Sequence, residues 1–84
     1  MSEYSDLKDI IDVLSIAIAR EESEEQFFRR SCKASTHKIA CEMFEEIAGE
    51  YASHSKNLES RRQVLIETLK DLNKSKNNNI FREK

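Results

Sequence analysis

The feature that most constrains the fold is an apolar stripe with alternating spacings of three and four residues, sustained without a proline. Residues at these spacings lie on one face of an α-helix. The first stripe runs through Leu7, Ile10, Leu14, Ala17, Glu21, Glu24, Phe28 and Ser31. The second runs through Ala40, Phe44, Ile47, Tyr51, His54, Leu58, Arg61, Leu65 and Leu72. The pattern predicts two long amphipathic helices, over about residues 6–34 and 37–72.

The segment 33–36 is the only credible break between the stripes, with Ser35 or Thr36 as the cap of the second helix. Two long helices joined by a short turn run antiparallel as a hairpin. A chain of 84 residues builds a marginal core alone, and a hairpin leaves one side of each stripe uncovered. We therefore expect an all-α, antiparallel two-helix hairpin that dimerises into a ferritin-like four-helix bundle.

The polar segment 73–84 ends the periodicity, so we expect it to be a disordered tail, with Ile80 and Phe81 as an alternative docking motif. Charged residues make up 36% of the chain, yet the net charge is −2 and the signs are interspersed. Without a basic stripe, we expect no nucleic-acid partner. Without an apolar run near the ~20 residues that span a bilayer, we expect no membrane partner.

No signal segment precedes the first predicted helix, so we expect a cytoplasmic location with Cys32 and Cys41 as small, buried thiols. A redox-sensitive disulfide between them across the hairpin is the alternative. With His37 they form a Cys-x4-His-x3-Cys pattern, which straddles the turn and lacks a clear fourth zinc ligand. We therefore expect His37 to be a surface residue. The sequence also lacks a nucleophile–base arrangement, a phosphate loop and a nucleotide fingerprint.

Polar residues interrupt both stripes at about the same height above the turn. Glu21 and Glu24 lie in the first stripe, and Tyr51 and His54 lie in the second. Burying an unpaired carboxylate is costly, so something must compensate it. A metal ion, a carboxylate–imidazolium pair and a solvent-open middle each do so, and the spacing does not choose among them.

The same residues resemble a known family. Residues 17–21 followed by Phe27 and Phe28 resemble the first helix of rubrerythrin-like, ferritin-like proteins, in which an alanine-led segment carries a ligand Glu. The second predicted helix resembles the family's Glu-x-x-His helix through Ala40, Met43, Phe44, Ile47, Ala48 and His54. With Glu21 on the first ligand, positions 51 and 54 fall on Glu-x-x-His without a gap, and the resemblance spans about residues 8–60.

The resemblance implies a di-iron site shared by two hairpins, each supplying one Glu and one Glu-x-x-His. It implies iron as the cofactor, ferrous-iron oxidation of the ferroxidase type, and relatives with metals held between subunits, as in short encapsulated ferritins. A homodimer or higher homo-oligomer would be the assembly. A shell or cargo partner also belongs to that picture, but the sequence does not identify one.

The chain departs from the family at Tyr51, which stands where the bridging Glu belongs. Glu21 and His54 remain as ligands, and Tyr51 as a phenolate, Glu50 or Glu24 would complete the site. The alternative is a metal-free homo-oligomeric interaction or assembly module, in which the site is degenerate and Tyr51 hydrogen-bonds Glu21.

Overall fold

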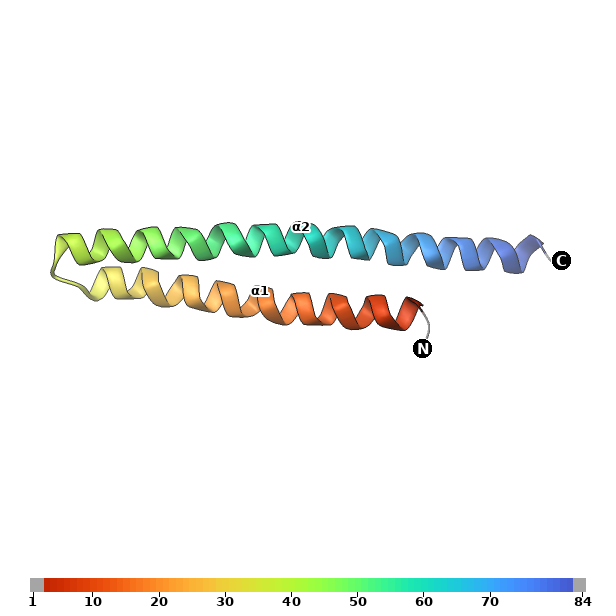
Figure 1. Ribbon diagram of the computed structural model, residues 1–84, viewed down its shortest axis with the longest axis horizontal. Coiled ribbons are helices and arrows are strands. Elements are labelled where there is room, and N and C mark those ends of the chain that lie inside the picture. Colours follow the sequence, from red (N-terminus) through yellow and green to blue (C-terminus); the bar gives the residue numbers. More distant parts are fainter. Residues whose placement is uncertain (1–2, 83–84) are drawn as a thin grey trace.

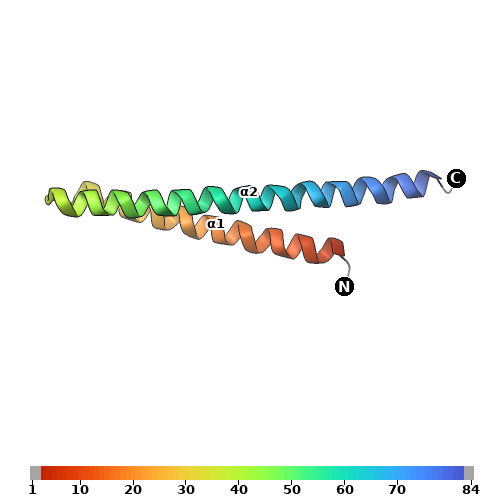
Figure 2. The same ribbon diagram turned by 45° about the horizontal axis from the view of Figure 1, so that its top comes forward.

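The computed structural model describes residues 3–82, and side chains as far as residue 74. Two helices form an antiparallel hairpin, α1 over Glu3–Ala34 and α2 over Lys38–Arg82. They lie side by side, and α2 runs on past the start of α1 (Figure 1). In the second view α1 crosses α2 at a shallow angle (Figure 2). The predicted hairpin is confirmed.

The ends of the helices follow from local chemistry. Glu3 and Asp6 occupy the first turn of α1 and Lys33 its last turn, as the helix dipole favours. At the turn, the Ser35 hydroxyl accepts a hydrogen bond from the His37 backbone N–H at 3.1 Å. The first backbone hydrogen bond of α2 runs from the Cys41 N–H to the His37 carbonyl, so His37 is the N-cap and the predicted cap at Ser35 or Thr36 is one or two residues early.

The second helix continues past residue 72, where the sequence stripe ends, and reaches Arg82. Neither proline nor glycine occurs in this stretch to stop it. Residues 83 and 84, and the side chains of Ile80 and Phe81, lie outside the described residues. The expectation of a disordered tail with a docking motif therefore stays a prediction.

The contact between the helices is narrow. Among the described residues, the most buried are Ile18 and Cys32 of α1 and Ala48 and Ser55 of α2. Ile18 retains 4% of its surface, while Ala48 retains none. Small residues at the contact leave little apolar volume between the two helices, so the core of one hairpin is thin.

In the half of the hairpin nearer the turn, aromatic rings add to the packing between the two helices. Phe28 of α1 lies 6.0 Å from Phe44 and 5.8 Å from Tyr51, measured between ring centroids. Phe27 packs edge-on against Phe28 at 5.2 Å. Towards the start of α1, Arg62 donates a hydrogen bond to the Ser15 hydroxyl at 3.1 Å and ties the helices together again.

On one side of the hairpin, here called the open face, large apolar side chains are exposed among charged ones. Its large exposed residues are Ile10, Val13, Ile16 and Phe27 of α1 with Ile39, Met43 and Val64 of α2. At 100° per residue, the α1 members span an arc of about 120° and the α2 members about 60°, on the same side of the helix contact. Ile10 belongs to the predicted stripe, yet it is exposed in the single hairpin.

The opposite side, here called the polar face, is charged. Glu22, Glu25, Arg29, Lys56 and Glu59 border a surface depression there. Glu25 and Arg29 form an ion pair of 2.8 Å within α1. At the same 100° per residue, the exposed Arg20 and Glu24 of α1 and Glu50 of α2 fall within the arcs of the open face, so this face mixes apolar and charged side chains.

Candidate functional site

Glu21 and His54 come together from the two helices, as the sequence predicts. Glu21 Oε1 lies 3.2 Å from His54 Nδ1, and the side chains keep 21% and 59% of their surface. The second carboxylate oxygen, Glu21 Oε2, is buried and has no hydrogen-bond partner among the described residues. Because a buried carboxylate oxygen without a partner is costly, Glu21 has unused capacity to bind a donor or a cation.

Tyr51 packs against an aromatic ring. Its ring is half-buried and stacks on Phe28 with an interplanar angle of 12°. Glu21 Oε1 faces His54 and not the Tyr51 hydroxyl that the sequence offers as an alternative partner. Tyr51 thus contributes aromatic packing at the position where the rubrerythrin-like pattern has a bridging Glu.

The two other acidic residues are exposed. Glu50 and His54 border the same shallow depression on α2, one turn apart, so both face the same solvent region. Glu24 is exposed on α1, one turn from Glu21. Glu50 is therefore placed near His54 and Glu24 near Glu21, and both side chains are free to reorient.

Within one hairpin, the ligand atoms near Glu21 and His54 are too few to complete a metal site. Among the described residues, the only group of three potential ligand atoms within 4.8 Å of one another is Cys32, Cys41 and Glu45. Glu21 and His54 supply two ligand atoms, fewer than a three-atom group.

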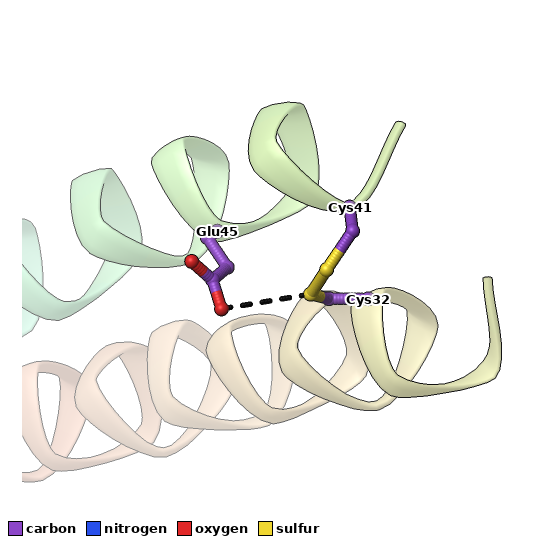
Figure 3. A group of neighbouring side chains, drawn as sticks. All are labelled: Cys32, Cys41 and Glu45. Atoms are coloured by element: carbon purple, nitrogen blue, oxygen red, sulfur yellow. Dashed lines mark hydrogen bonds between the residues drawn. A yellow bond between two sulfur atoms is a disulfide. The ribbon is translucent and has the colours of Figure 1, made fainter. Parts of the chain in front are cut away.

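The two cysteines are linked. A disulfide joins Cys32 near the end of α1 to Cys41 in the first turns of α2, and Glu45 lies beside it (Figure 3). The expectation of free thiols is wrong for this structure, because the turn brings the two sulfur atoms together. Their burial is as expected, since Cys32 is buried and Cys41 half-buried. His37 is exposed, as predicted, and is not part of the three-residue group.

Glu45 is the residue that sequence reasoning missed. Cys41 and Glu45 lie four residues apart and so share a face of α2, a relation that the sequence contains. The pairing of that face with Cys32 depends on the rotation of α2 about its axis, which the apolar stripe did not fix.

Comparison of the chain with protein-family models, with curated proteins and with solved structures finds no match. The ferritin-like resemblance therefore rests on the residues quoted above. Within residues 3–82, neither helix has a stretch long and apolar enough to cross a lipid bilayer.

Proposed function

We propose that the chain is a metal-binding protein of the ferritin-like type, in which two hairpins form a four-helix bundle and share a modified metal site. Glu21 and His54 of each copy would bind iron or a similar divalent ion between the subunits. The observation that carries this proposal is the buried, unpartnered Glu21 Oε2 beside a His54 imidazole that keeps 59% of its surface.

The size of the exposed surface supports a second copy of the chain as the partner. A compact monomer of 9.8 kDa exposes about 5,200 Å² by the relation between surface and mass. This chain exposes 6700 Å², an excess of about 1,500 Å². A stable interface removes about 800 Å² from each partner. The excess follows from the elongated shape of the hairpin, and it leaves room for an interface of standard size.

The distribution of residues also favours self-association through the open face. Apolar side chains protrude from both helices on this side, whereas the polar face carries ions of both signs. A twofold dimer covers the same patch on both copies, so its apolar residues can pack against each other, while Arg20 and Glu24 between them need an ion pair or a place at the rim of the interface. Pairing two open faces would bring both Glu21–His54 pairs towards the centre of one bundle.

The separation of the two ligand atoms suits a shared ion as well as the direct ion pair. Ligand oxygen and nitrogen atoms lie about 2.0–2.2 Å from a divalent ion such as zinc, so two of them on one ion are about 3–3.5 Å apart. Glu21 Oε1 and His54 Nδ1 are 3.2 Å apart. A carboxylate and an imidazole are ordinary ligands of divalent iron. When bound, iron would supply electron transfer to oxygen or peroxide, while Glu21 would offset part of its charge.

The second candidate is a metal-free assembly module with the same dimer. Tyr51 favours it, because both copies lack the bridging carboxylate and the Tyr51 ring is committed to stacking on Phe28. In that case Glu21 and His54 serve as a polar pair that fixes the alignment of the helices, a role that buried polar groups have in some bundles.

Loading the purified protein with ferrous iron under nitrogen separates the two candidates. We expect one or two irons per dimer by elemental analysis, with the dimer confirmed by light scattering. Glu21→Ala and His54→Ala should each abolish the bound iron, while the exposed neighbour Glu22→Ala should retain it. No iron above background on a helical dimer would reject the metal site and leave the assembly module. A helical monomer would reject both.

A second measurement uses the metal-free protein. Glu21→Gln removes the charge at the unpartnered Oε2 but keeps an oxygen that can accept a hydrogen bond from His54. Without metal, the free energy of unfolding should therefore stay unchanged or rise by about 1 kcal/mol. With metal, the same variant should be less stable than the unmodified protein, because bound ligand stabilises only the form that binds it. Equal stability of the two proteins in the presence of metal would contradict the proposed role of Glu21.

A further inference from the structure

The turn end of the hairpin carries a second cluster of metal-ligating atoms, separate from Glu21 and His54. Cys32, Cys41 and Glu45 each offer one ligand atom, all within 4.8 Å of one another. Cys32 lies eleven positions after Glu21 in α1, which is about 16 Å along the helix axis. The ligand types also differ, with two sulfur atoms here and none at Glu21.

The contact between Cys32 and Glu45 is suited to a reduced pair of cysteines. Cys32 Sγ and Glu45 Oε1 are 3.5 Å apart, within hydrogen-bonding distance (Figure 3). A sulfur atom in a disulfide has no proton to donate, so the carboxylate gains a hydrogen bond only when Cys32 is a thiol. Glu45 is thus placed to interact with a thiol or with an ion bound to the thiolate.

The distance between these atoms fits a common ion. Zinc binds thiolate sulfur at about 2.3 Å and carboxylate oxygen at about 2.0–2.2 Å, which in tetrahedral geometry puts the two atoms about 3.6 Å apart. The observed 3.5 Å agrees with this value. The two sulfur atoms would separate to about 3.8 Å, a movement that side-chain rotation at the ends of two helices can supply.

We propose that the reduced chain binds one thiophilic divalent ion, of the zinc type, through Cys32, Cys41 and Glu45. Reduction by a dithiol transfers two electrons and two protons to the disulfide, giving two thiols, while the reductant becomes a disulfide. Binding of the ion then releases both thiol protons. The two thiolates and the Glu45 carboxylate hold the ion, and water takes the fourth position.

The site has a path to solvent in the proposed dimer. Cys32 is buried and Cys41 half-buried, but Glu45 is exposed. At 100° per residue, Glu45 lies on the side of α2 that continues into the polar face, away from Ile39 and Met43 of the open face. Pairing through the open face therefore leaves the Glu45 side accessible, and the proposal does not depend on the proposed function.

Cobalt(II) titration of the reduced full-length chain under argon tests this proposal. We expect one equivalent to bind with an intense thiolate-to-cobalt absorption band, and zinc to displace it. The disulfide form should show no such band. Glu45→Gln should weaken binding about tenfold or more, because even groups that only support a ligand contribute 10–100-fold to metal affinity.

Matched variants identify the ligands and distinguish the two sites. Glu46→Gln, at the exposed neighbouring position, should bind cobalt as tightly as the unmodified chain. Glu21→Ala should also leave the thiolate band intact, although it should abolish iron binding at the proposed bundle site. Cys32→Ser and Cys41→Ser should each remove the band.

Two results would overturn the proposal. One is the absence of a thiolate band from a reduced chain that is still helical by circular dichroism, which would leave the cysteines as a structural disulfide only. The other is an unchanged cobalt affinity in Glu45→Gln, a surface substitution that should not impair folding, which would remove Glu45 from the ligands.

Discussion

Replacing Val13 by serine tests the open face as an interface between two copies. Val13 keeps 63% of its surface in the single hairpin, in the middle of the α1 part of this face. Valine and serine have similar helix propensities, so the substitution should change the stability of an isolated helix very little. The substitution should therefore act mainly on the dissociation constant of the dimer.

The magnitude follows from the exposed fraction. Complete burial of a valine side chain contributes about 1.5–3 kcal/mol, so covering the exposed share contributes about 1–2 kcal/mol per copy. A twofold dimer buries both copies, which gives about 2–4 kcal/mol in total. At 1.4 kcal/mol per tenfold change, the dissociation constant of the dimer should rise about 30- to 700-fold.

Sedimentation equilibrium over a range of concentrations measures this constant, with circular dichroism as a check on helix content. Gln26→Ser is the matched control, because Gln26 is exposed on the other side of α1 and receives the same new side chain. A dissociation constant within a factor of three of that of the control would refute the assignment of Val13 to the interface. A monomeric parent protein would refute the dimer itself.

Three further predictions concern stability, measured by urea unfolding at one fixed protein concentration. Ile18→Ala should lower the free energy of unfolding by about 2–3 kcal/mol, because Ile18 is among the few buried residues of the hairpin; a loss below 0.5 kcal/mol would contradict this role. Gly49→Ala should raise it by about 0.5–1 kcal/mol, since a Cβ atom there meets nothing within 4 Å of the single hairpin; a decrease would indicate that a partner covers this position. Reduction of the disulfide without added metal should lower it by about 2–3 kcal/mol, the cost of opening a short loop, and Cys32→Ser with Cys41→Ser should show the same loss under oxidising conditions.

The hairpin could be predicted because its determinants are local. The 3–4 stripe and the absence of proline specify two long helices, and a short connection leaves them only an antiparallel arrangement. The hydrogen bond of the Ser35 hydroxyl within the turn is equally local. The end of α2 is less predictable, because Asn, Lys and Ser are compatible with a helix even where no stripe indicates what it packs against.

The rotation of each helix could not be read from the stripe. The stripe is wide enough to serve both a partner within the hairpin and one outside it, so the sequence alone does not say which residues face which. Ile18 and Ala48 look like flanking residues in the sequence, yet they are the most buried apolar residues of α1 and α2 among those described. Ile10 and His54, at the centres of the stripes, are exposed.

In the candidate sites too, some contacts could be predicted from the sequence and others depend on the rotation of the helices. Glu21 and His54 were predicted to meet because their heights above the turn are set by counting residues, and they do. The stacking of Tyr51 on Phe28 and the position of Glu45 beside Cys32 depend instead on rotation and side-chain packing between helices. Such contacts follow only once the two helices are placed in space.

The complete burial of Ala48 has a consequence for the open face. A single methyl group at the helix contact sets how closely α1 and α2 approach, and therefore how far apart the ridges of Val13 and Met43 stand on the open face. A larger residue at position 48 would widen that spacing. The distance between the exposed apolar ridges thus depends in part on a residue that has no surface of its own.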